Sequence, residues 1–516
     1  SNPDSTSSTF AGVSSGNLTQ AAYPGGLTLN YTYDELNRLL TAEGLALTYD
    51  ERGDIVDSRD GNASFGATYD AGRRLRTVTY DGLATVTYTY DSRNLLTRVE
   101  DDLAGAWMEF EYDDDGRLTE IRRSNGVTTR FTYDDAGRVT RIRDVGANGG
   151  SPLADQQYTL NAEGEPVQVA RTLPFDPAPD PEALALNLTY DDAGQITSPG
   201  YAYDARGRQT AAPGRAFAYS GASRLVSVTA DGTTAALTYN GLGDLRTRTV
   251  DGATTHYYHN YALGLWPIVA EASAQTSEVS GDFGSLAGSR GQGGEGYKRF
   301  YVYTPGGALL YSMEPGSGAV RFYHFDRVGS TLFLTDGSGQ VTDAYAYDPY
   351  GNLLGHQGGS DQPFTYVGRY GVRWEPVGSL YDMRARAYDP ATARFLTRDP
   401  VWPLLADPQS LNVYQYVLQN PLQYVDPAGA QLFYQREPPL WMRESVKKVQ
   451  KQVGRIVRTE PLASEELKPV ATKPLVSVAT RGLKPVATEP LATRPALWSE
   501  AGLTGTRSVH VDIGEW

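Results

Sequence analysis

The stretch YDMRARAYDPATARFLTRDP, residues 381–400, is the richest in groups that could do chemistry. It holds two Tyr-Asp pairs, four arginines and two Asp-Pro steps. Two carboxylates held close together share one proton and can act as general acid and general base, while a guanidinium keeps one of them ionised and oriented. Asp-Pro is also a common turn pair, and Asp389, Asp399, Asp407 and Asp426 all precede proline. Taken alone, these residues favour turn formation over catalysis.

Other reactive groups are sparse. His256 and His259, in HYYH, have the i, i+3 spacing of a metal site on a helix, but in a strand they would point to opposite faces. GSRGQGGEGY (288–297) lacks the Lys-Ser/Thr of a phosphate loop and is typical of a flexible link. His510 near Asp512 is better explained by packing in a strand. There is no cysteine, which excludes disulfides and thiolate sites. We expect no metal and no cofactor.

A tyrosine-aspartate repeat runs through most of the chain. FEYDDDGRLTEI (110–121), FTYDDAGRVTRI (131–142) and YAYDARGRQTAA (201–212) share one pattern, and the whole sequence has 35 tyrosines. An aromatic strand ends in Asp, a turn with Gly follows, and the next segment alternates apolar and charged residues. The pattern predicts one hairpin per repeat, with Asp capping the turn and Gly supplying a positive φ. Roughly nine in ten of these aspartates are expected only to form turns.

Single hairpins are not stable alone, so the repeats must pair side by side into a long sheet. Such a sheet twists and coils, and we expect it to curl into a shell or barrel. Arg after Gly is expected to lie against the tyrosine or carboxylate of the next repeat. FDPAPDPEAL (175–184) is interpreted as a stiff insertion between strands. The predicted fold class is therefore all-β.

The chain resembles the RHS/YD-repeat family. The resemblance covers about residues 20–430 and is closest in FYHFDRVGSTLFLTDGSGQVTDAYAYDPYGN (322–352), FTYVGRYGVRWEPVGSLYDMRARAYDPATARFLTRDP (364–400) and DPQSLNVYQYVLQNPLQYVDPAGA (407–430). It implies a β shell closed by an RHS repeat-associated core. The domains implied are a YD-repeat shell at 1–297 with a Gly-rich link near 275–297, the core at 298–430 and a variable C-terminal region at 431–516.

The resemblance also implies an aspartic-type self-cleaving site in the core. Its matching residues are Arg386, Asp399 and Asp426, with the cut between Ala430 and Gln431. One aspartate would draw a proton from water, and the other would donate one to the carbonyl oxygen. The two aspartates lie 27 positions apart, so only the fold can join them.

The sequence departs from the family pattern near this site. Ala393 stands where glycine is usual before RFL, Trp402 where glycine is common, and Ala430 where leucine usually ends the motif. No carboxylate is lost, but each change could misplace one, and small errors of position are costly in catalysis.

Charge is distributed unevenly. The net charge is −15, and because residues 431–516 carry 13 Lys/Arg against 9 Asp/Glu, the rest of the chain is strongly acidic. An acidic body argues against nucleic-acid binding by the shell, whereas the basic tail could bind that shell or an acidic partner. No 18-residue apolar run exists, so no transmembrane segment is expected. The start, SNPDSTSSTF, has no features of a signal peptide, and we expect the chain to be a piece of something longer.

The tail begins with a predicted amphipathic helix, WMRESVKKVQKQVGRIV (441–457), and continues with Pro-punctuated repeats such as LKPVAT. Docking of this helix on the acidic shell is at least as plausible as membrane or nucleic-acid binding. The tail contains no nucleophile–base pair that supports a known activity.

Two functions follow. The first is a secreted or surface scaffold that encloses and presents a C-terminal effector, with an exporter and an immunity protein as implied partners. The alternative is a structural or adhesive extracellular YD-repeat protein without toxic cargo, in which the tail is an attachment or capping strand. Carbohydrate binding by tyrosine-rich faces is a third reading. The shell is small for the family, so it would enclose little or be the end of a longer one.

Overall fold

The fold is described from a computed structural model, which covers residues 9–12, 17–147, 149–177, 186–273, 296–401, 411–430, 433–434 and 509–512. Within these residues the protein is almost entirely antiparallel β structure, which confirms the predicted all-β class. No helix in the described part is long and apolar enough to cross a bilayer. The predicted tail helix, 441–457, lies outside the described residues.

The first sheet has 17 strands in the described part and holds the N-terminal repeats. It contains β1 (Thr9–Gly12), β2 (Leu18–Ala22), β3 (Thr28–Tyr33), β4 (Leu39–Ala42), β5 (Leu45–Tyr49), β6 (Ile55–Asp60), β7 (Ala63–Tyr69), β8 (Leu75–Tyr80), β9 (Ala84–Tyr90), β10 (Leu96–Asp101), β11 (Trp107–Tyr112), β12 (Leu118–Arg123), β13 (Thr128–Tyr133), β14 (Val139–Val145), β15 (Ala154–Leu160), β16 (Pro166–Thr172) and β37 (Val509–Asp512). Apart from β37, which pairs with β16, neighbours in the sheet are neighbours in sequence.

The second sheet has 14 strands in the described part. It contains β17 (Ala202–Tyr203), β18 (Gln209–Ala212), β19 (Arg215–Tyr219), β20 (Leu225–Ala230), β21 (Thr233–Tyr239), β22 (Leu245–Val250), β23 (Ala253–His259), β24 (Ile268–Ser273), β25 (Tyr297–Tyr303), β26 (Leu309–Met313), β27 (Val320–Phe325), β28 (Thr331–Thr335), β29 (Val341–Tyr347) and β30 (Leu353–Gln357). It runs without interruption across residue 297, because β24 pairs with β25.

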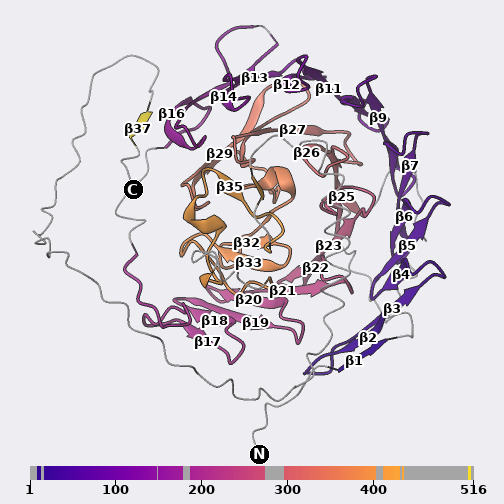
Figure 1. The fold of residues 1–516 in the computed structure, drawn as a ribbon, viewed down its shortest axis with the longest axis vertical. Coiled ribbons are helices and arrows are strands. Elements are labelled where there is room, and N and C mark those ends of the chain that lie inside the picture. Colours follow the sequence, from indigo (N-terminus) through magenta and orange to yellow (C-terminus); the bar gives the residue numbers. More distant parts are fainter. Residues whose placement is uncertain are drawn as a thin grey trace, which may run out of the picture.

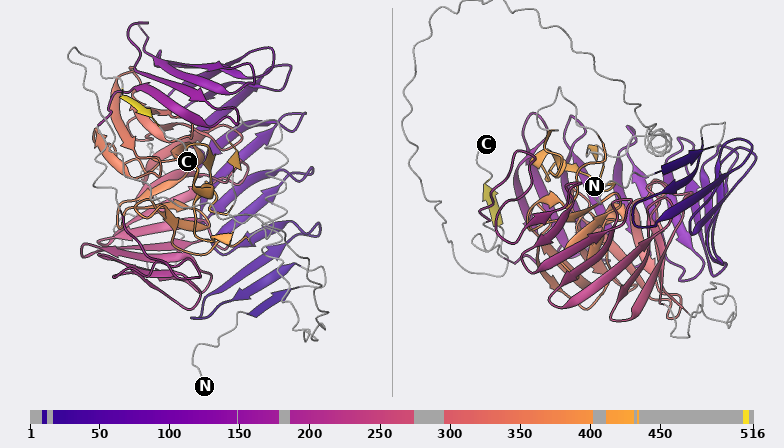
Figure 2. Two further views of the ribbon diagram at one scale, coloured as in Figure 1. Left: turned by 60° about the vertical axis from the view of Figure 1, so that its left-hand side comes forward. Right: turned by 90° about the horizontal axis from the view of Figure 1, so that it is seen from below.

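The remaining described chain forms a compact unit at 364–430, which we call the plug. It contains β31 (Arg373–Glu375), β32 (Leu380–Met383), β33 (Arg386–Asp389), β34 (Arg394–Phe395) and β35 (Tyr424–Val425), which pairs with β36 (Phe433–Tyr434), and the short 3-10 helices η2 (Gly368–Tyr370) and η4 (Val417–Gln419). Figure 1 shows the first sheet as an outer arc, the second sheet inside it and the plug at the centre. The two sheets curl around the plug as a shell, without closing into a barrel (Figure 2).

Each repeat turns as its sequence predicts. In FTYDDAGRV, Asp134 Oδ1 accepts the backbone N–H groups of Ala136 (3.0 Å) and Arg138 (2.9 Å), and Gly137 has φ 74°. A β-bulge precedes the tyrosine, between Thr132 and Tyr133. Bulges recur at this point in most hairpins and bend the strand, so the repeat itself supplies curvature. The reading of these aspartates as turn formers is confirmed.

A ladder of arginine and tyrosine joins consecutive hairpins. Arg117 donates to Asp113 Oδ2 (2.7 Å) and lies 5.3 Å from the ring centre of Tyr133, whose hydroxyl donates to the Leu118 carbonyl (2.6 Å). The same stacking recurs for Arg38 on Tyr49, Arg74 on Tyr90 and Arg208 on Tyr219. In these four pairs, consecutive hairpins are fixed to each other by a tyrosine hydrogen bond and a cation–π contact, as the sequence predicts.

His259 occupies a ladder position in place of tyrosine. Its Nε2 lies 2.9 Å from the Leu245 carbonyl oxygen and its Nδ1 lies 2.9 Å from that of Trp266. Both ring nitrogens therefore face backbone oxygens, which gives the second histidine of HYYH a structural role.

The two sheets meet over a buried aromatic layer. Tyr80 and Tyr88 of the first sheet donate hydrogen bonds to the carbonyls of Tyr301 (2.8 Å) and Tyr303 (2.9 Å) of the second. All four side chains are buried. Tyr80 also packs on Phe300 with ring centres 5.2 Å apart. Since Tyr80 and Tyr301 are more than 200 residues apart, this layer unites the described shell into one body.

Candidate functional site

The predicted site residues converge in the plug. Arg386 begins β33, Asp399 follows β34, and Asp426 follows β35. Asp399 is held by its own N–H, which donates to the Val413 carbonyl (2.9 Å). Three segments that are distant in sequence are thereby brought to one point.

A single nitrogen of Arg386 contacts both carboxylates. Nη2 lies 2.7 Å from Asp399 Oδ2 and 3.2 Å from Asp426 Oδ2. The two oxygens cannot be farther apart than the sum of those distances, so the two carboxylates lie close together on one guanidinium. The fold thus supplies the carboxylate pair and the guanidinium that self-cleavage would need.

The guanidinium of Arg386 is almost completely buried. The Arg386 side chain is 2 % exposed, and its guanidinium carbon lies 3.5 Å from the centre of the Phe395 ring. Burial lowers the pKa of Arg386, while Asp426 and Asp399 act in the opposite direction. Arginine stays charged under these conditions, so it is a fixed positive charge between the two carboxylates.

The two aspartates differ in their access to water. The Asp399 side chain is 27 % exposed and that of Asp426 is 6 % exposed. Asp399 Oδ1 accepts the N–H of Val401 (2.8 Å), and Asp426 Oδ1 accepts the N–H of Ala430 (3.1 Å). Asp426 therefore lies against the residue of the predicted cut, and Asp399 lies nearer to solvent.

The predicted cut falls in the connection between two paired strands. β35 pairs with β36, matching Tyr424 with Tyr434 and Val425 with Phe433. Ala430 is half-buried in this connection, whereas Gln431 lies outside the described residues. The segment that would be cut is thus anchored on both sides.

Two of the sequence departures can be located. Ala393 adopts φ 54°, the left-handed conformation that explains why glycine is usual there, so the backbone shape is kept at some cost in strain. Ala430 keeps its backbone contact with Asp426. Trp402 lies outside the described residues, as does Asp407.

Asp389 has a different role from Asp399 and Asp426. It is fully buried, and its Oδ2 lies 2.6 Å from a nitrogen of Arg215 on β19. Glu375 of the plug likewise accepts two hydrogen bonds from Arg248 on β22, at 2.7 and 2.8 Å. These ion pairs fasten the plug to the second sheet.

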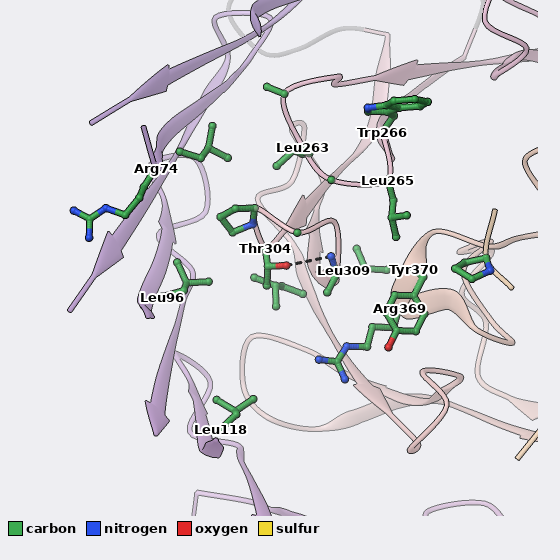
Figure 3. A pocket seen from close by; sticks show the side chains of 18 of the residues that line it. Arg74, Leu96, Leu118, Leu263, Leu265, Trp266, Thr304, Leu309, Arg369 and Tyr370 are labelled. Atoms are coloured by element: carbon green, nitrogen blue, oxygen red, sulfur yellow. Dashed lines mark hydrogen bonds between the residues drawn. The ribbon is translucent and has the colours of Figure 1, made fainter. Parts of the chain in front are cut away.

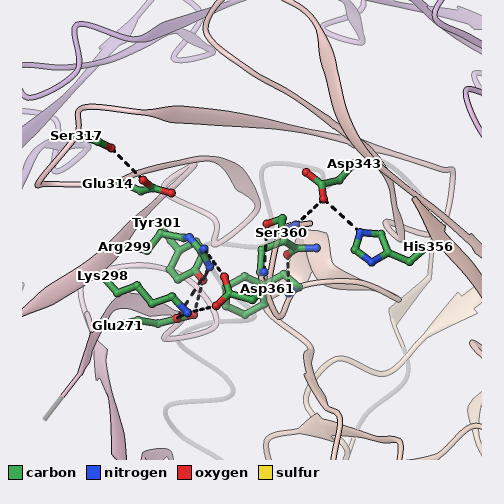
Figure 4. Close-up of polar contacts among 12 residues, drawn as sticks. Glu271, Lys298, Arg299, Tyr301, Glu314, Ser317, Asp343, His356, Ser360 and Asp361 are labelled. Carbon is green, nitrogen blue, oxygen red and sulfur yellow. Dashed lines mark hydrogen bonds and ion pairs between the residues drawn. The ribbon is translucent and has the colours of Figure 1, made fainter. Parts of the chain in front are cut away.

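A second polar cluster lies where the plug begins (Figure 4). Asp361 is bound by Lys298 and, at 2.8 Å, by Arg299. Burial raises the pKa of Asp361, but these hydrogen bonds outweigh it and lower the pKa to about 2. Asp343 accepts the N–H of Ser360 (2.8 Å) and contacts His356 Nε2 (3.2 Å). The cluster ties the segment before the plug to the second sheet.

A cavity of about 1760 Å³ lies between the two sheets and the plug. Figure 3 shows Leu96 and Leu118 of the first sheet facing the loops at 263–266 and 304–308, whereas the Arg74 side chain points away from them. From the plug, Arg369, Tyr370, Gln423, Val425 and Pro427 reach the wall. The chain that carries the predicted cut therefore runs along the side of the cavity.

Comparison with known proteins identifies the class. The sequence matches the family described as RHS Repeat over residues 112–150 and that described as Teneurin YD-shell over residues 295–422. The second match contains Arg386 and Asp399 and ends just before Asp426. A comparison with curated proteins gives no match.

Solved structures show the same fold. The crystal structure of TcdB2-TccC3 without hypervariable C-terminal region has a TM-score of 0.56 at 14 % identity, over 82 % of this chain and 27 % of that chain. The crystal structure of TcdB2-TccC3-Cdc42 has a TM-score of 0.56 at 14 % identity, over 88 % of this chain and 28 % of that chain. The structure of the Photorhabdus luminescens Tc holotoxin pore has a TM-score of 0.51 at 14 % identity, over 84 % of this chain and 27 % of that chain.

The fold and the matches together define a YD-type β shell with a plug. Its sequence contains an RHS repeat and a YD-shell segment, as its patterns indicate, and its fold is similar to that of TcdB2-TccC3. It spans about a quarter of the length of the structures that it matches.

Sequence reasoning missed one residue of the site. Arg384, two positions before Arg386, donates to the Pro427 carbonyl and so contacts the segment before the predicted cut. Arg384 is one of the four arginines crowded into residues 381–400. Without the fold, however, the sequence does not distinguish it from an arginine on the surface.

Proposed function

We propose that this protein is a secreted or cell-surface shell that encloses and presents its C-terminal region and releases it by self-cleavage after Ala430. The observation that carries the proposal is the contact of one Arg386 nitrogen with both Asp399 and Asp426, the latter bonded to the N–H of Ala430. Three residues from separate segments meet at the turn that ends with Ala430. A turn-forming role alone does not require that meeting.

The proposed reaction is hydrolysis of the Ala430–Gln431 peptide bond. Asp399, the more exposed carboxylate, takes a proton from water as the water oxygen attacks the Ala430 carbonyl carbon. Asp426 in its neutral form donates its proton to the Ala430 carbonyl oxygen. As the intermediate collapses, Asp399 passes the proton that it took from water to the Gln431 nitrogen, Asp426 takes its proton back from a hydroxyl of the intermediate, and the carbon–nitrogen bond breaks. The products are a carboxylate at Ala430 and a free amine at Gln431. Arg386 holds both carboxyl groups in place.

The cavity limits what this shell could enclose. A compact domain of the tail's size has a radius of gyration of about 12 Å and occupies on the order of 10⁴ Å³. The cavity, at about 1760 Å³, is much smaller. We therefore propose that it holds an extended segment of the 431–516 region rather than the whole region folded.

The adhesive alternative is favoured by a different observation. β37, at residues 509–512, pairs antiparallel with β16 in register Gln168–Asp512 to Arg171–Val509. A strand added to a sheet edge protects that edge from other chains. In this reading the tail caps the first sheet and stays attached. Sugar binding has less support, because ladder tyrosines such as Tyr49 and Tyr90 are covered by arginines.

Intact mass measured under denaturing conditions tests the proposal, with Asp399→Asn and Asp426→Asn as variants. Wild type should split into two fragments and both variants should remain whole. Asp389→Asn is the matched control, because Asp389 also precedes proline but pairs with Arg215. An intact wild-type chain would refute self-cleavage. Expression of 431–516 alone in bacteria tests the effector: growth arrest is expected, and normal growth would favour the adhesive reading.

A further inference from the structure

The turn between β32 and β33 contacts three consecutive carbonyls just before the predicted cut. Arg384 Nη1 donates to the Pro427 oxygen, and the Ala385 N–H donates to the Ala428 oxygen at 3.1 Å. Arg386 Nε donates to the Gly429 oxygen. We call residues 384–386 the carbonyl clamp.

The clamp leaves no room for a side chain at position 429. A Cβ there would lie 2.3 Å from the Met383 oxygen and 2.9 Å from the Arg386 nitrogen. Gly429 also has φ 65°, which L side chains rarely adopt. The backbone of the turn before the cut is thus packed directly against residues 383–386.

Arg384 is itself fixed by the shell and the plug. Its Nε donates to the Leu265 carbonyl (3.1 Å) and its Nη2 to the Tyr370 carbonyl (2.8 Å). Its own carbonyl accepts a hydrogen bond from Arg224 (2.7 Å), and its φ is 57°. A guanidinium whose planar fork serves three carbonyls has one allowed orientation, which an ammonium cannot reproduce.

We propose that the 384–386 turn is the substrate-binding element of the self-cleavage site and that Arg384 is its positioning residue. The inference rests on the proposed self-cleavage. Arg386 then has two roles, since its Nη2 orders the carboxylates while its Nε holds the Gly429 carbonyl. Arg384 acts one step earlier, by fixing Pro427 so that Ala430 is presented to Asp426 and Asp399. It touches neither aspartate nor the bond that breaks.

The shell contact gives this site a built-in dependence on assembly. Leu265 belongs to the loop between β23 and β24, and it lines the cavity. Arg384 can therefore take its position only once the second sheet has folded around the plug. Cleavage would follow the packing of the second sheet on the plug instead of preceding it.

The test uses the full chain with Arg384→Ala and Arg384→Lys. Displacement of reacting groups by about 1 Å can cost about 100-fold in rate, so Arg384→Ala should purify largely uncut. Millimolar guanidinium added to that purified protein should restore cutting, which a merely misfolded variant would not show. Arg384→Lys should remain slow. Arg327→Ala is the control, because Arg327 also joins shell and plug carbonyls, at Gly164 and Leu422, without touching 426–430.

Hydrogen exchange in the Asp399→Asn background tests the positioning role of Arg384 separately from self-cleavage. Adding Arg384→Ala should speed exchange at the amides of Ala385, Gly429 and Ala430 by at least tenfold, with the first sheet unchanged. Cutting at the wild-type rate by Arg384→Ala would overturn the positioning role while leaving self-cleavage intact. An uncut wild type would refute both self-cleavage and the positioning role, and unchanged exchange would show that the clamp itself is wrong.

Discussion

Acid should loosen the contact between the two sheets at one histidine. His324 on β27 is fully buried, with Nδ1 2.9 Å from Asp144 Oδ1 on β14 and Nε2 3.0 Å from Thr335 Oγ1 on β28. Thr129 on β13 bonds the same Asp144 oxygen at 2.5 Å, and Arg123 on β12 donates to Thr129 at 2.8 Å. The group joins strands of both sheets.

Burial lowers the pKa of His324 to about 4, and Arg123 acts in the same direction. The unfolded chain binds the proton with a pKa of about 6.5. The pKa of His324 is lower in the folded protein than in the unfolded chain. Its stabilising contribution to folding is therefore complete above pH 6.5 and is lost as the pH falls toward 4. The pKa of Asp144 is lowered, so its own contribution is lost only below about pH 3.9, outside this window.

The magnitude follows from linkage. Between pH 7.5 and 4.5 the histidine should cost about 2.5 kcal/mol of stability. For a cooperative unit of about 400 residues, that corresponds to a fall in Tm of about 3 °C. Other groups also titrate in this range, so the quantity to measure is the difference between variants.

Thermal unfolding should be recorded at both pH values for wild type, His324→Gln and His356→Gln. The fall in Tm should be about 3 °C smaller for His324→Gln than for wild type. His356→Gln, which removes a histidine from the edge strand β30, should behave as wild type does. An equal fall in wild type and His324→Gln would refute the reasoning about this buried group.

Three further predictions concern single contacts. Tyr88→Phe removes the hydroxyl that donates to the Tyr303 carbonyl and should cost about 1–2 kcal/mol in denaturant unfolding, whereas Tyr190→Phe, 49 % exposed, should cost almost nothing; equal costs would contradict the sheet contact. Gly429→Ala should abolish self-cleavage on a denaturing gel, while Gly232→Ala, with φ 79° and no atom within 4 Å of its Cβ, should not; cutting by Gly429→Ala would exclude the tight fit at that position. Asp134→Ala removes the acceptor for two backbone N–H groups and for the Arg138 side chain, and it should lower the free energy of unfolding by about 1–3 kcal/mol. Asp135→Ala, at an exposed position, is the control, and unchanged stability of Asp134→Ala would rule out its capping role.

Much of the repeat could be predicted because its determinants are local. Asp134, Gly137 and Arg138 fix the turn within five residues, and Arg117 meets Tyr133 because the next hairpin is always adjacent. The choice of partners between sheets is not local. Every repeat offers a similar tyrosine, so nothing in the pattern shows that Tyr80 faces Tyr301 rather than another copy.

The site shows the same division. Arg386, Asp399 and Asp426 could be named from the family resemblance, and the fold brings them together as expected. Arg384 could not, because its partners Leu265, Tyr370 and Pro427 are backbone carbonyls, which leave no trace in the sequence. The structural role of His259 could not be predicted either, since a ladder position that normally holds tyrosine carries an imidazole there.

The central claim is that the plug cuts its own chain at a defined bond. The most direct measurement is the mass and C-terminal residue of the large fragment from wild-type protein, purified and denatured at once. The account predicts a fragment that ends at Ala430, with a partner that begins at Gln431, and none from Asp399→Asn or Asp426→Asn. A cut elsewhere, or a cut at Ala430 that persists in both variants, would contradict it.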